Sequence, residues 1–213
     1  MTPLPKYGLY AITDSTLTPE HSLVEQVTEA IRGGAAVIQY RDKNATHAEK
    51  RQRAIALQNI CHQHNIPFIV NDDIALAKEL NADGVHLGAD DSSIVEARRR
   101  LGKNAIIGAS CYNDFQLALE AQQHGASYIA FGRFFPSDTK PSAVQADVTL
   151  IQRAKEILTI PVVAIGGITP ENGHVLVDAG ADFLAVVAGI FAANDPHHAA
   201  RQYAEIFHKH LNT

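Results

Sequence analysis

Cysteine is scarce in this chain: Cys61 and Cys111 provide neither a disulfide framework nor the paired spacing of a zinc site. Long apolar runs are also missing. The longest, 183–193, has eleven residues with one glycine counted, whereas a membrane-spanning helix needs about 20. The N-terminal segment 1–6 has no apolar core of a signal peptide. We therefore expect a cytoplasmic protein with reduced thiols and no membrane partner.

An excess of basic residues is absent as well. The 18 Lys and Arg residues against 23 Asp and Glu residues give a formal net charge of −5. Sequence-independent nucleic-acid binding relies on basic surface, so we expect no nucleic-acid partner. With 213 residues, 46% of them apolar and 19% charged, the composition is that of a globular protein. We expect one domain over residues 1–213.

Short apolar runs alternate with longer amphipathic ones along the chain. The short runs are nearly continuous in apolar character and rich in Val and Ile, which is typical of parallel strands buried on both faces. The stretches between them have helical spacing, and the last predicted helix covers about 195–211. The eight predicted strands are 7–13, 35–40, 67–71, 83–87, 105–110, 127–132, 161–166 and 182–187.

A repeated pair of small residues precedes every second predicted strand. Gly or Asn followed by Ala is suited to a helix C-cap, where a left-handed residue is needed. The pairs are Gly34-Ala35, Asn81-Ala82, Gly125-Ala126 and Gly180-Ala181. Eight successive βα units form either a closed barrel or a doubly wound sheet. Because no Gly-x-Gly-x-x-Gly follows the first strand, we predict the α/β class and a single (β/α)8 TIM barrel.

Charged residues follow several predicted strands, at the end of a barrel where active sites are built. Fixed cations beside carboxylates are typical of a polyphosphate that basic side chains and a divalent metal hold together. Mg²⁺ in such sites takes one or two carboxylates plus phosphate oxygens. The residues concerned are Arg41, Lys43, Lys140, Asp72, Asp73, Asp90 and Asp91.

A glycine pair, Gly166-Gly167, follows the seventh predicted strand. Glycines allow a backbone to approach a phosphate, and Thr169 with Pro170 predicts the start of a helix whose N–H groups face the anion. A tight turn with an N-cap explains the same residues without a ligand. The longest predicted non-helical stretch, about 133–148, is a candidate lid.

Three other groups have simpler structural explanations than chemistry. The run Cys61-His62-Gln63-His64 falls at a predicted helix end away from the strand termini, so we do not expect it to bind a metal. His86 lies in mid-strand and is predicted to be a core side chain. Cys111 has no identifiable base partner, so we do not expect a nucleophile.

Six segments in order at the strand ends carry a resemblance to the thiamine-phosphate synthase family. The likeness extends from Leu9 to about Phe191. The family joins 4-amino-5-hydroxymethyl-2-methylpyrimidine diphosphate to a thiazole phosphate and releases pyrophosphate. The segments are 39–43 (QYRDK), 71–72 (ND), 83–88 (DGVHLG), 108–110 (GAS), 135–140 (FPSDTK) and 164–169 (AIGGIT).

The resemblance implies a role for each matching residue. Mg²⁺ would be held by Asp72 and Asp91, and the catalytic residues would be Lys140, Arg41 and Ser110. The thiazole phosphate would meet Thr139, Gly167 and the backbone at Ala188. The full substrate-binding set implied is Gln39, Arg41, Lys43, Asn71, Ser110, Ser137, Thr139, Lys140, Gly167, Val187 and Ala188.

The family's path is dissociative, with the carbon–oxygen bond breaking before the thiazole nitrogen attacks. No protein nucleophile is then needed, in keeping with the absence of a Ser–His or Cys–His pair in the sequence pattern. The family also tends to form homo-oligomers. The chain departs from the family pattern at Ala188, where Ser is frequent, at Tyr112, where many relatives have His, and at Arg133, where Pro is common.

Three alternatives remain open at this stage. A thiazole tautomerase of the same superfamily would rely on a histidine near Tyr112, which is absent. A Schiff-base aldolase would need a lysine within a strand, and none of the predicted strands contains one. A non-catalytic sensor of thiamine precursors could keep all of these residues, and only activity distinguishes it.

Overall fold

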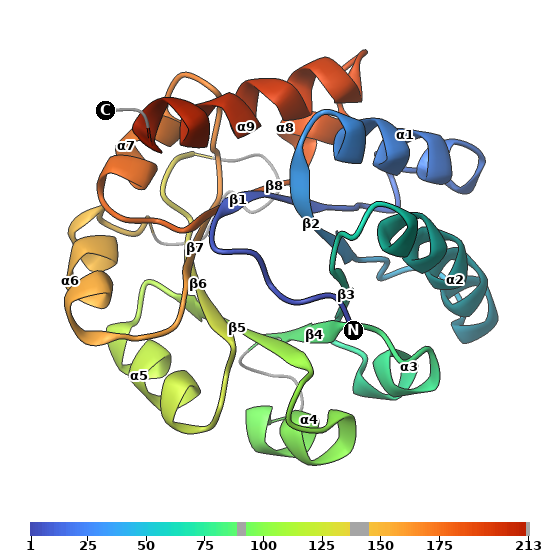
Figure 1. The fold of residues 1–213 in the computed structure, drawn as a ribbon, viewed down its shortest axis with the longest axis horizontal. Helices are drawn as coiled ribbons and strands as arrows, with labels where there is room; N and C mark the ends of the chain where they lie inside the picture. Colours follow the sequence, from blue (N-terminus) through green and yellow to red (C-terminus); the bar gives the residue numbers. More distant parts are fainter. Residues whose placement is uncertain (89–92, 137–144, 212–213) are drawn as a thin grey trace.

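The computed structural model describes residues 1–88, 93–136 and 145–211. Eight parallel strands close into one barrel in chain order, with β1 paired to both β2 and β8 (Figure 1). The predicted (β/α)8 barrel is therefore confirmed. The strands are β1 (Gly8–Ile12), β2 (Ala35–Tyr40), β3 (Phe68–Asn71), β4 (Gly84–Leu87), β5 (Ile106–Tyr112), β6 (Tyr128–Gly132), β7 (Val162–Ile165) and β8 (Phe183–Val186).

Helices form the outer ring of the barrel (Figure 1). The described residues include one helix more than predicted, because α8 follows β8 within the same apolar run. A continuous apolar run carries no periodicity that would mark a change from strand to helix. The helices are α1 (Glu20–Arg32), α2 (His47–Gln63), α3 (Ile74–Glu79), α4 (Ile94–Leu101), α5 (Phe115–Gln123), α6 (Thr149–Ile157), α7 (Gly173–Asp178), α8 (Ala188–Phe191) and α9 (Pro196–Leu211).

The apolar core has two parts, one between the strands and the helices and one inside the barrel. Helix α1 shows how the outer part forms, because Leu23, Val27 and Ile31 recur at helical spacing and are all buried. Burial of each such side chain stabilises the fold by about 1.5–3 kcal/mol. Inside the barrel the largest buried side chains include two phenols, Tyr10 and Tyr128.

The four predicted helix C-caps all have a left-handed backbone. Their φ angles are 107° at Gly34, 50° at Asn81, 90° at Gly125 and 106° at Gly180. An L-residue with a larger side chain would be strained there, whereas Gly adopts this region freely and Asn tolerates it. Each of these residues turns the chain from a helix into the next strand, so the four positions recur once in every two βα units of the barrel.

The end of the barrel where the strands begin, which we call the N-terminal face, is held by a buried carboxylate. Asp83 accepts hydrogen bonds from the backbone N–H of Phe68 at 2.9 Å and of Thr2 at 2.5 Å. The imidazole of His62 also faces this carboxylate, with Nε2 3.0 Å from Oδ2, and the amino group of Met1 lies 4.0 Å from Oδ1. The segment that starts at Thr2 crosses this end of the barrel (Figure 1). The contact with Asp83 gives His62 a structural role at the end of α2.

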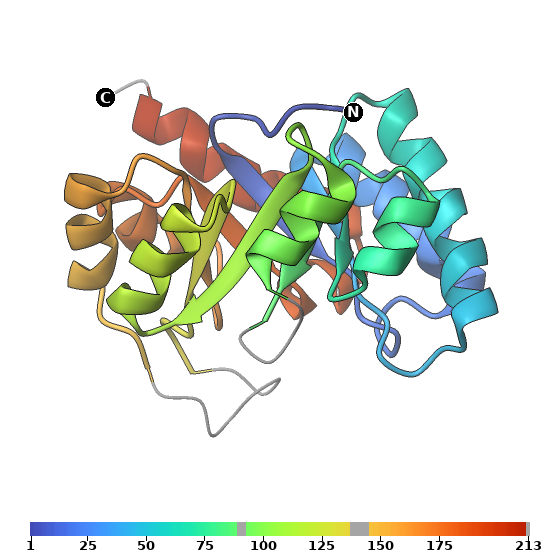
Figure 2. The ribbon, with the colours of Figure 1, turned by 90° about the horizontal axis from the view of Figure 1, so that it is seen from below.

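A second anchor of the N-terminal face is the guanidinium of Arg98 on α4. It donates to the backbone carbonyl oxygens of Ala105 and Gly125, both at 2.7 Å, and to Ser127 Oγ at 3.2 Å. These acceptors precede β5 and β6, so one side chain ties two βα units together. In the side view of Figure 2 the strand arrows point away from this face, toward the opposite end of the barrel.

Candidate active site

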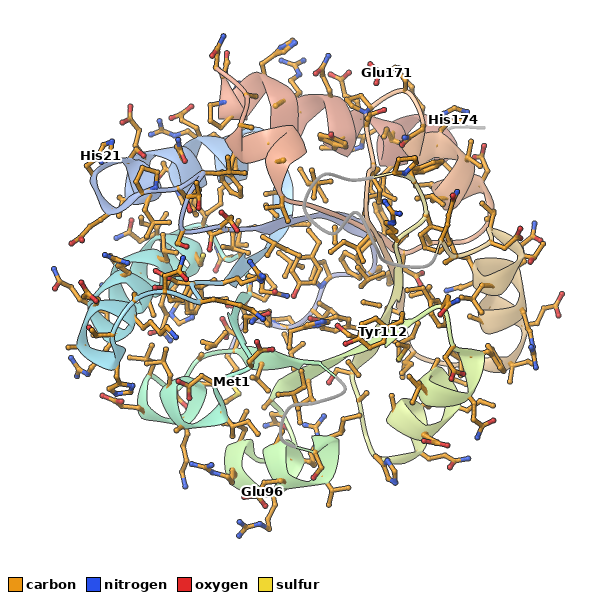
Figure 3. The ribbon with its side chains drawn as sticks, turned by 180° about the vertical axis from the view of Figure 1, so that it is seen from behind. Met1, His21, Glu96, Tyr112, Glu171 and His174 are labelled. Atoms are coloured by element: carbon orange, nitrogen blue, oxygen red, sulfur yellow. The ribbon has the colours of Figure 1, made fainter. Side chains whose placement is uncertain are left out.

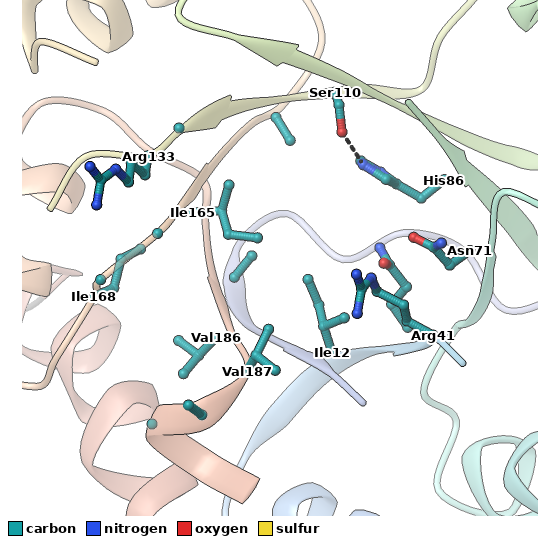
Figure 4. Close-up of a pocket in the computed structure, with 18 of the residues that line it drawn as sticks. Ile12, Arg41, Asn71, His86, Ser110, Arg133, Ile165, Ile168, Val186 and Val187 are labelled. Carbon is teal, nitrogen blue, oxygen red and sulfur yellow. Dashed lines mark hydrogen bonds between the residues drawn. The ribbon is translucent and has the colours of Figure 1, made fainter. Parts of the chain in front are cut away.

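A cavity of about 300 Å³ opens at the carboxyl ends of the strands, at the small end of the range for ligand pockets. Polar side chains from β2 to β5 lie on one side of it, and aliphatic side chains from β7 and β8 lie on the other (Figure 4). The lining includes most of the predicted substrate-binding residues: Gln39, Arg41, Asn71, Ser110, Gly167, Val187 and Ala188.

A second depression adjoins this cavity through Asn71, which lines both. It holds two of the predicted site residues, Lys43 and Asp72, and Lys43 Nζ lies 4.0 Å from Asp72 Oδ2. Asn71 Nδ2 donates to the same carboxylate oxygen at 2.6 Å. Asp72 has a φ of 63°, which Asp tolerates better than most residues, and its N–H donates to the carbonyl oxygen of His86 at 2.8 Å. A cation, an amide and a carboxylate thus lie side by side at the edge of the cavity.

Arg41 is oriented by the end of the first strand. Its Nη1 lies 3.2 Å from Asp14 Oδ2, and its backbone N–H donates to Thr13 Oγ1 at 2.9 Å. The side chain is one-quarter exposed and reaches toward the cavity (Figure 4). The sequence pattern assigns no role to Thr13 or Asp14. Their contacts with Arg41 show that they position the guanidinium, whose other N–H groups can meet an anion.

The prediction that His86 is a core residue is wrong. Its ring lines the cavity, with Nε2 2.9 Å from Ser110 Oγ and Nδ1 2.9 Å from the Tyr128 hydroxyl (Figure 4). Strand alternation could have indicated this, because Val85 and Leu87 are buried against the helices and the residue between them must point into the barrel. The expected absence of a Ser–His pair is also wrong, because the fold brings together two residues that are 24 positions apart in the sequence.

Hydrogen bonds continue from His86 across the barrel interior. The Tyr128 hydroxyl lies 2.6 Å from that of Tyr10, and Gln39 Nε2 donates to the Tyr10 oxygen at 2.9 Å. Burial raises the pKa of both phenols, so both hydroxyls keep their protons. Space for the Tyr128 ring depends on Gly108, because a Cβ at that position would overlap the phenol. We call Gln39, Tyr10, Tyr128, His86 and Ser110 the interior chain.

The turn after β7 has the predicted glycine geometry but not the predicted helix. Gly167 has a φ of 66°, and a Cβ there would overlap the carbonyl oxygens of Phe135 and Pro136. The backbone N–H of Gly167 has no acceptor among the residues described. It lies in the cavity wall and is free to bind an anion.

Helix α7 begins at Gly173, not at Thr169 and Pro170 as predicted. The reason is the side chain of Asn172, whose Oδ1 accepts from the Thr169 N–H at 2.8 Å and whose Nδ2 donates to the Gly167 carbonyl at 3.1 Å. These bonds hold residues 167–172 as a turn. The N–H groups that this wall offers to an anion therefore belong to a turn, not to a helix N-terminus.

Three residues near the cavity bear on the chemistry. Cys111 is buried, and burial raises the pKa of its thiol to about 12, which disfavours a thiolate at neutral pH. Tyr112 is 43% exposed and lies near the centre of the open face (Figure 3). Arg133 lines the same cavity from the end of β6. Two of the positions at which the sequence departs from the expected family pattern, Tyr112 and Arg133, thus lie at the open end of the barrel.

Five predicted residues fall outside the described part of the chain: Asp90, Asp91, Ser137, Thr139 and Lys140. The candidate lid at 133–148 also lies in part outside it, at residues 137–144. Within the described residues, no three His, Cys, Asp or Glu side chains group as metal ligands would. In that same part, no helix is both long and apolar enough to cross a membrane. Of the predicted metal pair, Asp72 alone can be located, at the cavity edge beside Lys43.

Comparison with known proteins gives a consistent result. Residues 9–190 match the family model described as thiamine monophosphate synthase. The thiamine-phosphate synthase of Nitrosococcus oceani is 51% identical over 200 residues, covering 94% of this chain and 92% of that protein. That of Thioalkalivibrio sulfidiphilus is 48% identical, covering 94% and 95%. The structure of thiamine phosphate pyrophosphorylase from Pyrococcus furiosus superposes with a TM-score of 0.86 at 37% identity, covering 96% of each chain.

Proposed function

Because the chain belongs to the thiamine-phosphate synthase family and joins a pyrimidine to a thiazole to make thiamine phosphate, we propose that the open end of its barrel carries out this transfer. The pyrimidine ring would lie in the cavity between Gln39 and Ser110. Its diphosphate would extend past Arg41 and Asn71 toward Lys43. The thiazole phosphate would occupy the opposite wall.

One observation carries this assignment: a cavity with one polar and one aliphatic wall adjoins a depression that holds fixed cations and carboxylates. Asn71 lines both, so a molecule with a ring at one end and a diphosphate at the other would span them. A tautomerase acting on a thiazole alone would have no use for the depression. The relatives at 48–51% identity are also named as synthases.

The donor set at the depression fits Mg²⁺. Asp72 offers a hard carboxylate oxygen at the cavity edge, and Asp91 would supply the second carboxylate. Bound there with the diphosphate oxygens, Mg²⁺ would neutralise charge on the departing pyrophosphate. Lys43, 4.0 Å from Asp72, would then contact the same phosphates from the protein side.

The transfer balances without a protein nucleophile. The carbon–oxygen bond of the pyrimidine diphosphate breaks and its electron pair leaves with pyrophosphate. The resulting positive charge is spread by the aminopyrimidine, and the thiazole nitrogen forms the new carbon–nitrogen bond. Arg41, Lys43 and Lys140 would stabilise the growing negative charge, and Ser110 would bind the ring. Asp14 holds Arg41 in place before the reaction, so little reorganisation is needed.

The thiazole phosphate would bind the wall formed by Gly167, Val187 and Ala188, together with Ser137 and Thr139. We expect Gly167→Ala to raise the KM for thiazole phosphate by about tenfold, because its Cβ would push the turn away from Phe135 and Pro136. The KM for the pyrimidine diphosphate should change little. Initial rates with each substrate varied in turn measure both constants, and equal changes in the two would contradict this placement.

The activity itself is tested with the purified full chain, the two substrates and Mg²⁺. We propose that residues 1–213 work as a single barrel domain. The expected result is thiamine phosphate, measured as fluorescent thiochrome after oxidation, with an equal amount of pyrophosphate. A chelator should stop the reaction and excess Mg²⁺ restore it. No product from a folded protein would favour a precursor-binding barrel, and product that survives the chelator would remove the metal from the proposal.

A further inference from the structure

The hydrogen bonds of the interior chain all run in one direction, from Gln39 toward Ser110, as a count of donors and acceptors shows. The amide nitrogen of Gln39 can only donate, so the Tyr10 oxygen is the acceptor in that bond. The Tyr10 proton then has one acceptor among the described residues, the oxygen of Tyr128 at 2.6 Å. Both phenols are buried, with exposed fractions of 1% and 0%, so a proton without an acceptor would be costly there.

The same count of donors and acceptors assigns the bonds from Tyr128 to His86 and from His86 to Ser110. Because Tyr128 accepts from Tyr10, its own proton goes to Nδ1 of His86 at 2.9 Å. The neutral imidazole then carries its hydrogen on Nε2 and donates it to Ser110 Oγ at 2.9 Å. Ser110 has one lone pair occupied in this way, so its own hydroxyl proton is available to the cavity.

We propose that Tyr10, Tyr128 and His86 are positioning residues that fix which groups donate and which accept at the pyrimidine. Ser110 then presents a donor to the cavity, and Gln39 presents its amide oxygen as an acceptor. This inference rests on the proposed function, which puts the pyrimidine ring between these two residues. A 4-aminopyrimidine complements the pattern, since its amino group donates and its adjacent ring nitrogen accepts. A 4-oxopyrimidine has the opposite pattern and is disfavoured.

The structure also explains how the pattern is kept rigid. The rings of His86 and Tyr128 stack with centroids 5.6 Å apart at 21°, and Tyr10 meets Tyr128 edge-on at 5.8 Å. Phe183 closes the far side of Tyr10 at 6.5 Å. This packing holds the two hydroxyl oxygens and the imidazole nitrogens in place. Reversing the hydrogen bonds would require the Gln39 amide to flip, both hydroxyl hydrogens to turn and the tautomer of His86 to change together, because each donor depends on its neighbour.

The first test reads the tautomer of His86 by NMR of the ¹⁵N-histidine-labelled full chain, assigned with His86→Gln. The expected state has the proton on Nε2. Tyr128→Phe removes the donor to Nδ1, so this preference should be lost. Tyr203→Phe is the matched control: it removes another buried phenol bond, to the carbonyl of Ile168 at 3.1 Å, and should leave the signals of His86 unchanged. A proton on Nδ1 in the unaltered protein would overturn the proposal.

The second test compares the Kd of the 4-amino and 4-oxo forms of the pyrimidine diphosphate, without thiazole phosphate. Tyr128→Phe should lower the preference for the amino form by about tenfold, whereas Tyr203→Phe should keep it. Tyr10→Phe breaks the chain at another point and should act in the same direction, which keeps the test valid if Tyr128→Phe does not fold. An unchanged preference in both variants would refute the specificity role.

The two tests separate this inference from the proposed function. The tautomer is measured without substrate, so a proton on Nδ1 would refute the inference even in an active synthase. If the proton is on Nε2 but neither diphosphate binds, the location of the pyrimidine is wrong, and the specificity role fails with it.

Discussion

Replacement of Arg41 by alanine should lower kcat/KM for the pyrimidine diphosphate by ~10³-fold, or about 4 kcal/mol of transition-state stabilisation. The guanidinium lies at the cavity beside the diphosphate position, and Asp14 already holds it at 3.2 Å. Its attraction for the phosphates grows as the leaving group gains charge, so most of the loss should appear in kcat. Initial rates over a range of the diphosphate measure both constants.

Controls separate charge from geometry at this position. Arg41→Lys keeps the charge but loses the planar donor fork, so it should recover only part of the rate. Arg32→Ala removes an equal charge from an exposed position near the N-terminal face, where it pairs with Glu29, and should leave turnover unchanged. The rate of Asp14→Ala should fall between those of Arg41→Ala and the unaltered enzyme, because this variant keeps Arg41 but removes the carboxylate that orients it. A rate near that of the unaltered enzyme in Arg41→Ala would show that the diphosphate binds elsewhere.

Asp72→Asn should lower kcat by ~10²-fold and raise the Mg²⁺ concentration needed for half-maximal rate. Asparagine tests the role of the charge more specifically than alanine does at this position. It tolerates the φ of 63° and can still accept from Asn71 Nδ2, so the negative charge is the main thing lost. Rates measured across a Mg²⁺ titration test the expectation.

The neighbouring carboxylate provides the control for that experiment. Asp73 caps α3 by accepting from the Leu76 N–H at 2.8 Å, and Asp73→Ser keeps a capping oxygen while removing the same charge one residue away. The Mg²⁺ dependence of Asp73→Ser should stay close to that of the unaltered enzyme. If both variants raise the Mg²⁺ concentration needed for half-maximal rate by the same factor, the cause is the general loss of negative charge, and Asp72 is not a ligand.

The barrel and the charged part of the site were predictable from sequence for the same reason. Parallel strands buried on both faces leave continuous apolar runs, so the residues that break each run mark the strand ends. Arg41, Asn71 and Asp72 were found in this way, and the structure brings them to one edge. The left-handed caps, such as Asn81, were predictable because few residues tolerate that backbone.

The interior chain could not be found in that way. Tyr10, Tyr128 and His86 lie within strands, where aromatic side chains are usual, and composition does not show whether such a ring faces the helices or the barrel axis. Their hydrogen-bond partners are 24 to 118 residues away in sequence, so no local spacing links them. The start of α7 was missed because the side chain of Asn172 overrides the N-terminal signal of Pro170.

The anchors at Asp83 and Arg98 have a practical consequence for engineering. They stabilise the end of the barrel where the strands begin, while the reacting groups lie where the strands finish. Substitutions at well-separated sites usually add independently. A library confined to the N-terminal face could therefore be selected for heat tolerance with no loss of turnover, avoiding the usual trade-off between robustness and activity.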